Sequence, residues 1–187
     1  MIGEVEVLRE KSFQGRSSEL KGKTIKKVDR VAKMVVMEFF GWEKVAMIHL
    51  KMTGQLVWRP VDAKQEGKSQ NVKGKSEVPA AHLYNGPQVV GGHPSEDWVK
   101  ELPDGHTRVV INFTDKSRLF FNDLRVFGWM KTVSRAQWSE LRKKLPPDVV
   151  DKDFTLSYFK KVLVSSGRAV KLAVMIVTGK HSQIIKK

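Results

Sequence analysis

The chain contains no cysteine, and this absence excludes disulfide bonds and any zinc site built on thiolates. It also lacks an uninterrupted apolar run of the roughly 18 residues that a membrane-spanning helix needs. The acidic start, Met-Ile-Gly-Glu, has neither the basic nor the apolar region of a secretory leader. These absences predict a protein without a membrane partner, compatible with a reducing cytosol.

Positive charge is the first feature that the chain has in excess. Lysine and arginine total 34 against 20 aspartates and glutamates, which gives a formal net charge of +14 over 187 residues. Such a surface favours a polyanion partner, namely DNA, RNA or anionic lipid, although an inert basic surface explains the same balance. No basic amphipathic helix with an aromatic apolar face stands out, so nucleic acid is favoured over membrane.

Residues 1–133 show the patterns of β-structure. Alternating or dense apolar segments predict strands at 4–9, 25–40, 44–60, 107–113 and 118–123. Turn residues separate these segments, and the polar stretch 61–81 is predicted to be an exposed loop. Several strands in succession predict a mostly antiparallel β-sandwich or barrel.

The period of the apolar residues changes at about residue 134. Ser134 is a plausible N-cap, and Trp138, Leu141 and Leu145 follow at helical spacing. A second short helix is predicted at 155–166, closed by Gly167, and 168–177 fits either a helix or a buried strand. The fold class is therefore predicted to be α+β, with a β-sandwich domain over 1–133 followed by a short, incomplete helical region over 134–187.

Lys33 lies between apolar residues in the segment predicted to be a strand. A partly desolvated amine is a better base or nucleophile, whereas an edge lysine that extends to water has no such role. Met52 precedes Thr53-Gly54 at a predicted strand junction, where a long apolar side chain can insert between bases or pack on the core. His49, on the preceding strand, has no second ligand at a useful spacing and is predicted to be structural.

Two further segments combine cations with turn positions. His106 and Arg108 stand at the beginning of a predicted strand and suit phosphate contacts, or simply end a loop. In "FFNDLRVFGW", Arg125 offers a planar donor group and Phe127 a wedge, while Gly128 allows close approach. The alternative for this segment is an ordinary strand end with one aromatic core residue.

Four segments, in the same order, resemble one family of DNA-repair enzymes. "RVAKMVVMEF", "IHLKMTGQL" and "LFFNDLRVFGWM" resemble the N-terminal β-sandwich domain of formamidopyrimidine-DNA glycosylase and endonuclease VIII. "LPPDVVDKDFT" resembles the segment that leads into the helix–two-turn–helix domain of these enzymes. The resemblance covers roughly 5–60 and 105–175, so it includes most of the chain.

The resemblance implies a base-excision-repair protein, a DNA glycosylase and abasic-site lyase for oxidised bases. Its partner would be double-stranded DNA with a damaged base or an abasic site, bound by a monomer in the bacterial cytoplasm or nucleoid. Residues at the positions of Met52, Arg125 and Phe127 fill the hole left when the damaged nucleotide is flipped out of the helix.

The resemblance also assigns three cationic or polar positions. Lys33 matches the strand lysine that acts near the damaged base and its phosphate. Lys171, in "RAVKLAV", matches a lysine at the start of the helical domain that contacts the phosphate backbone. His106 falls on a loop histidine of the family.

The chain departs from the family at both ends. Family enzymes start with a Pro-Glu pair whose secondary amine attacks the sugar, and nothing here supplies it. The turn that carries an asparagine in the helical domain is not matched, and the zinc ribbon has no cysteines, so no cofactor is predicted. The expectation is a glycosylase core with impaired chemistry, in which Lys33 or the terminal amine retains weak abasic-site cleavage. The alternatives are a non-catalytic DNA-binding module and a basic β-domain that binds RNA or a protein.

Overall fold

The structure is a computed structural model that describes residues 1–61, 87–93, 102–145, 147 and 152–165. Most of the loop predicted at 61–81 lies outside these residues, as do Gly167, Lys171 and the segment 168–177. Neither described helix is long and apolar enough to cross a membrane.

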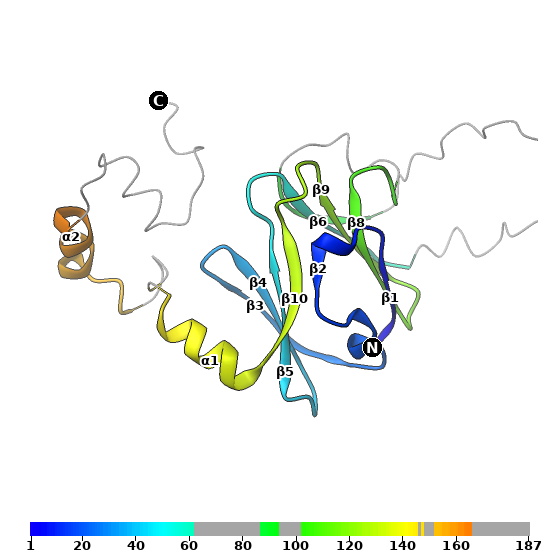
Figure 1. Cartoon of the computed structure of the whole chain (residues 1–187), viewed down its shortest axis with the longest axis horizontal. Coiled ribbons are helices and arrows are strands. Elements are labelled where there is room, and N and C mark those ends of the chain that lie inside the picture. The colour runs from blue at the N-terminus through cyan, green and yellow to red at the C-terminus, as the bar shows by residue number, and fades with distance from the viewer. Residues whose placement is uncertain (62–86, 94–101, 146, 148–151, 166–187) are drawn as a thin grey trace, which may run out of the picture.

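Two five-stranded sheets form the body of the protein (Figure 1). The first has the order β1-β8-β9-β6-β7 and the second the order β2-β10-β5-β4-β3. All pairs are antiparallel except β10 with β2. The strand bounds are β1 Ile2–Val7, β2 Phe13–Gln14, β3 Ile25–Val31, β4 Met34–Phe39, β5 Lys44–His49, β6 Gly54–Arg59, β7 Val89–Gly92, β8 Thr107–Phe113, β9 Arg118–Asp123 and β10 Trp129–Ser134. Two 3-10 helices, η1 Glu10–Ser12 and η2 Ser17–Leu20, follow β1 and β2.

The main core lies between the two sheets. Phe121 from the first sheet and Phe39 from the second are almost completely buried in one cluster that draws on both. In β5, Ala46 and Ile48 face this core while Val45 and Met47 face the other side. The run "VAMI" is therefore continuously apolar because β5 is buried on both faces. The predicted class, a mostly antiparallel β-sandwich with few helices, is confirmed.

The outer face of β5 is covered by α1 (Arg135–Lys143). Trp138 packs there, and Ser134 is the N-cap of the helix, as predicted. The Gln137 backbone N–H donates to Ser134 Oγ at 3.1 Å, and the Ser134 N–H donates to Gln137 Oε1 at 3.0 Å, which completes a capping box. A second helix, α2 (Leu156–Ser165), begins after Thr155, whose hydroxyl accepts from the Tyr158 N–H at 3.1 Å.

The prediction of one strand over 25–40 is wrong. The segment is a hairpin, in which β3 and β4 pair through a turn at Ala32 and Lys33. Ala32 has φ 53, a left-handed conformation that hairpin turns usually assign to glycine, asparagine or aspartate. Because no such residue marks the turn, the apolar pattern gave no sign of it. Lys33 consequently occupies a turn and not the interior of a strand.

Candidate nucleic-acid interface

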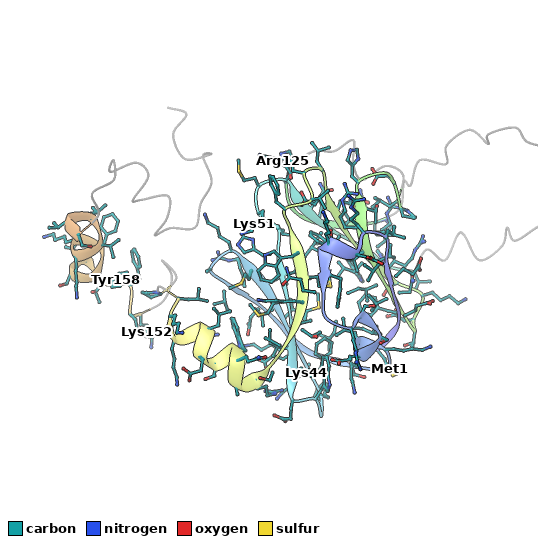
Figure 2. The ribbon with its side chains drawn as sticks, viewed as in Figure 1. Met1, Lys44, Lys51, Arg125, Lys152 and Tyr158 are labelled. Atoms are coloured by element: carbon teal, nitrogen blue, oxygen red, sulfur yellow. The ribbon has the colours of Figure 1, made fainter. Side chains whose placement is uncertain are left out.

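Three loops that carry predicted site residues meet at one end of the sandwich. Across the second sheet, Trp129 pairs with His49 and His49 pairs with Met34, so the β3–β4 turn, the end of β5 and the start of β10 share this edge. In the first sheet, Gly54 at the start of β6 pairs with Asp123 at the end of β9. Figure 2 shows the consequence: Lys51 and Arg125 lie at one end, with Lys44 and Met1 at the other.

Met52, Arg125 and Phe127, hereafter the wedge residues, all project from these loops. Met52 lies in the β5–β6 turn and is 58% exposed, and Phe127 lies in the β9–β10 loop and is 57% exposed. The Arg125 guanidinium carbon is 4.8 Å from the centroid of the Phe127 ring, a cation–π arrangement that keeps the two side chains together. The prediction that Met52 stands at the tip between two strands is confirmed.

Asp123, which no sequence pattern singled out, ties together the two loops that carry the wedge residues. It is fully buried at the end of β9. One carboxylate oxygen accepts from the Thr53 hydroxyl at 2.5 Å and from the Arg125 N–H at 3.3 Å, and the other accepts from the Gly128 N–H at 2.6 Å. The Met52 turn and the Arg125–Phe127 loop are thus held by one side chain.

The β9–β10 loop is tightly constrained at two positions. At Gly128, an added Cβ would lie 2.7 Å from the Phe121 ring and 3.1 Å from an Asp123 carboxylate oxygen, so only glycine fits. Val126 has φ 57, which is a genuine outlier for a β-branched residue. Backbone strain of this kind concentrates at functional sites, where the surrounding contacts maintain it.

His106 and Arg108 lie at the same end, and the predicted strand start is confirmed. The His106 ring Nδ1 is 3.1 Å from Asp104 Oδ2, and the His106 carbonyl accepts from the Asp123 N–H at 2.9 Å. Arg108 donates from Nε to the Asp123 carbonyl at 2.8 Å and from a terminal nitrogen to the Gly105 carbonyl at 3.1 Å. Arg108 therefore braces the loop, and the phosphate contact expected of it stays a prediction.

A half-buried histidine with a displaced pKa lies beside Lys33. Burial of the His49 ring, followed by the positive charges of Lys51 and Lys33, lowers its pKa from the ordinary 6.5 to about 4. Its Nδ1 accepts from the Lys51 backbone N–H at 3.0 Å, and its ring lies 5.6 Å from that of Trp129. His49 is therefore neutral at neutral pH and held in place, in keeping with the structural role expected of it.

No group of three or more histidine, aspartate or glutamate side chains in the described ranges could hold a metal ion. Zinc does not fit these residues, which also include no cysteine. The contacts at this end of the sandwich belong to loops and strand ends, and they use backbone amides, cations and apolar side chains. Such groups can bind and reshape a polyanion.

The fold and this edge define a class of protein: a β-sandwich domain whose loops present cations and exposed apolar side chains at one end. The model of the formamidopyrimidine-DNA glycosylase N-terminal domain matches residues 1–130. The chain therefore belongs to the formamidopyrimidine-DNA glycosylase family.

Two curated relatives illustrate the similarity. The chain is 29% identical over 181 residues to a formamidopyrimidine-DNA glycosylase of Ligilactobacillus salivarius, covering 93% of this chain and 51% of that protein. It is 35% identical over 72 residues to one of Listeria monocytogenes, covering 37% of this chain and 26% of that protein. It thus spans about half the length of the Ligilactobacillus relative.

Two Lactococcus lactis structures share the fold. One is a complex with DNA containing an abasic site, with a TM-score of 0.63 and 21% identity, covering 95% of this chain and 53% of that one. The other is a complex with DNA containing Fapy-dG, with the same TM-score and identity, covering 95% of this chain and 54% of that one.

Proposed function

We propose that this chain is a DNA-binding part of a base-excision-repair glycosylase and that it recognises duplex DNA with a damaged base or an abasic site. The observation that carries this proposal is that Asp123 joins the two loops that carry the exposed wedge residues. These loops lie at one end of a chain whose net charge is +14. Family membership supports the repair role, and the ligands of the Lactococcus structures support the choice of substrate.

The wedge residues would occupy the space left by an extruded nucleotide. Extrusion costs a few kcal/mol of stacking and pairing, and the cost is smallest where the base is damaged or missing. Met52 and Phe127 supply apolar surface, while the guanidinium of Arg125 can donate hydrogen bonds to the orphaned base opposite. Because Arg125 and Phe127 are already in contact, little additional ordering is needed on binding.

Binding of labelled duplexes with and without an abasic site tests this proposal. Met52→Ala, Phe127→Ala and Arg125→Ala should each lose about tenfold or more on the abasic duplex relative to the intact one, since a stacking contact is worth roughly 1–3 kcal/mol. Phe40→Ala is the matched control, because Phe40 is 60% exposed in the turn between β4 and β5, at the opposite end. Equal losses on both duplexes, or tighter binding to duplex RNA, would reject the proposed function.

The finer proposal concerns the lyase step. The Lys33 amine would attack the C1′ aldehyde of an open abasic sugar, releasing water and forming an imine. Lys33 makes no ion pair with a described residue and lies at the same edge as the wedge residues, which supports this role.

Borohydride trapping on abasic-site DNA tests the lyase step, because it reduces the imine to a stable covalent adduct. Lys33→Arg should remove the adduct and Lys27→Arg should keep it. An undiminished adduct in Lys33→Arg would assign the chemistry to another amine.

A further inference from the structure

The end of the sandwich opposite the wedge residues carries two aromatic side chains in one turn. This turn joins β4 to β5, and its residues Phe40 and Trp42 flank Gly41, whose φ of 59 supplies the tight bend. Phe40 is 60% exposed, although Phe39 directly before it is fully buried in the main core. Trp42 is half-buried and meets the Phe39 ring edge-on, with 5.2 Å between the ring centroids. Phe40 is therefore exposed to solvent on a well-packed base.

Two ammonium groups share the ring of Trp42, and only one of them has a carboxylate partner among the described residues. Lys23 places its Nζ 5.4 Å from the ring centroid, and Lys44 places its Nζ 5.9 Å from it. Lys44 Nζ is 2.6 Å from Glu19 Oε2, whereas Lys23 has no such partner in the described part of the chain. A carboxylate from another molecule would complete for Lys23 the arrangement that Glu19 completes for Lys44.

Further positive charge lies on both sides of Lys23. Lys21 and Lys26 are exposed, and neither forms an ion pair with a residue that the structure describes. The Phe40 N–H donates to the Thr24 carbonyl at 3.0 Å, so the segment 21–26 runs directly beside the aromatic turn. Three lysines and an exposed phenylalanine thus share one surface.

The carboxylates nearest to the turn are directed elsewhere. Arg135 lies 3.6 Å from Glu38 and 3.9 Å from Glu43, and its Nε donates to the Trp42 carbonyl at 3.2 Å. Both carboxylates therefore lie toward Arg135, and the positive charge of the three lysines remains available to a partner.

We propose that Phe40, Trp42 and the lysines Lys21, Lys23 and Lys26 form a docking surface for an acidic peptide segment of a partner protein. A carboxylate of the peptide would pair with Lys23 beside the Trp42 ring, and an apolar side chain would cover Phe40. Lys21 and Lys26 would attract the segment electrostatically. Aromatic side chains that a partner buries supply much of the affinity of protein interfaces.

Charge and position favour this occupant over others. A second copy of the chain would bring a further net charge of +14, which opposes association. β4 and β5 have six residues each and run from this turn to the end that bears the wedge residues, so the two ends are about 20 Å apart. Because a duplex is stiff over this distance, DNA bound by the wedge residues leaves the turn free. The surface is therefore separate from the proposed DNA interface, and both could be occupied at once.

Selection from a random peptide library tests the surface with the partner still unidentified. The library is displayed on phage and selected on the wild-type chain, with abasic-site duplex present in excess to cover the wedge residues. The retained peptides should combine several aspartates or glutamates with at least one aromatic or aliphatic residue. A selection that retains no acidic peptides would overturn the proposal.

Variants show where the retained peptides bind. With a fluorescein-labelled peptide, Phe40→Ala should weaken binding about tenfold or more and Lys23→Met several-fold, because they remove the aromatic contact and the unpaired charge. Leu8→Ala and Lys143→Met are the matched controls. Leu8 is 50% exposed and its N–H donates to Arg108, at the end that bears the wedge residues, while Lys143 is exposed on α1. Unchanged binding by Phe40→Ala and Lys23→Met, or equal losses in all four variants, would reject the docking surface.

The indole N–H resonance of Trp42, assigned with Trp42→Phe, distinguishes a peptide from a nucleic acid. It should shift with the retained peptide and stay in place with abasic-site duplex or with single-stranded DNA. A shift with DNA alone would make the turn a second nucleic-acid contact and overturn the assignment to a protein. A chain that bound no DNA would reject the proposed function, whereas a peptide-induced shift of Trp42 in that same chain would still support this surface.

Discussion

The carboxylate of Asp123 illustrates how a single residue can set the geometry of two loops. Its two oxygens accept from Thr53 and from the backbone of the Arg125–Gly128 segment. Both oxygens are needed, because each faces a different donor. The precision of the wedge therefore depends on a side chain that is buried and cannot itself touch DNA.

Replacing Asp123 with Asn should weaken the hydrogen bonds that hold the loops of the wedge residues in place. An amide supplies only one oxygen, so its NH₂ group would face either the Gly128 N–H or the Arg125 N–H and leave the hydrogen bond from that backbone amide unmade. We expect a loss of about 1–3 kcal/mol in the free energy of unfolding, measured by urea denaturation. Preference for the abasic duplex should also fall, at temperatures where the variant remains folded.

Asp115→Asn is the matched control for this change. Asp115 lies at the other end of β9, and a single oxygen accepts both from the Ser117 N–H at 3.0 Å and from its hydroxyl at 2.6 Å. These hydrogen bonds help to lower the pKa of Asp115. Because asparagine can keep both bonds, this variant should retain its preference for abasic DNA. Equal loss of preference in the two variants would contradict the specific role of Asp123.

The lowered pKa of His49 predicts a stability that falls in acid. Unfolding restores the pKa from about 4 to about 6.5, so the unfolded chain binds more protons between these values. The contribution is fully present above pH 6.5 and is lost as the pH falls towards 4. The shift corresponds to an upper limit of about 3 kcal/mol, and solvent screening of the half-buried ring reduces this to about 1–2 kcal/mol.

Urea denaturation of wild type and His49→Asn at pH 7 and pH 4.5 measures this effect. Asparagine can accept from the Lys51 N–H and does not titrate. The wild type should therefore lose about 1–2 kcal/mol more than the variant on acidification. The carboxylates are common to both proteins and cancel in the difference. Identical losses would show that His49 does not titrate as its surroundings imply.

At the scale of elements, each of the three site loops contains a non-glycine residue with positive φ. These are Ala32 at 53°, Lys51 at 55° and Val126 at 57°. A left-handed conformation costs such residues roughly 1–2 kcal/mol, and most for the β-branched one. The surrounding hydrogen bonds and packing therefore hold these three loops in backbone conformations that their residues disfavour.

The variant Val126→Gly tests whether the left-handed backbone conformation at this position contributes to DNA recognition. Glycine relieves the left-handed conformation but adds about 0.5–1 kcal/mol of unfolded-state entropy, so thermal stability should change little. The freer loop should nevertheless bind abasic DNA several-fold more weakly, because ordering Arg125 and Phe127 then opposes binding. Gly22, which has φ 75 and lies in open space away from these loops, provides a comparison: Gly22→Ala should destabilise the fold and leave DNA preference intact. Unaltered binding by Val126→Gly would show that the strain serves no purpose in recognition.

The sequence predicted elements wherever local pattern and tertiary environment agree. Period-two strands, the N-cap at Ser134 and the Thr53-Gly54 junction are examples. The turn at Ala32-Lys33 was missed because it uses no turn residue. The wedge residues were selected for their chemistry at predicted turns, and the family resemblance supplied their joint role. The Asp123–Thr53 hydrogen bond joins residues 70 positions apart and has no local signature. The same holds for the pairing of His49 with Trp129, which only the sheet register brings together.

At the scale of the whole molecule, net charge and wedge geometry should contribute separately to DNA binding. The +14 charge acts on phosphates, which intact and abasic duplexes present almost equally. The wedge acts on the missing base, which only the abasic duplex presents. Salt should therefore change the affinity for both duplexes in parallel, while the ratio of the two affinities stays constant.

With about five phosphate contacts, log K should fall with log salt at a slope near −4.5 on both duplexes. Affinities measured between 50 and 200 mM salt, a range in which multiple phosphate contacts lose several decades, give the slopes directly. Phe127→Ala should lower the abasic affinity by a constant factor at every salt concentration, because it removes no charge. A slope near zero would exclude a phosphate-driven interface. A preference for abasic DNA that disappeared at high salt would show that the preference is electrostatic, and it would contradict the role of the wedge residues.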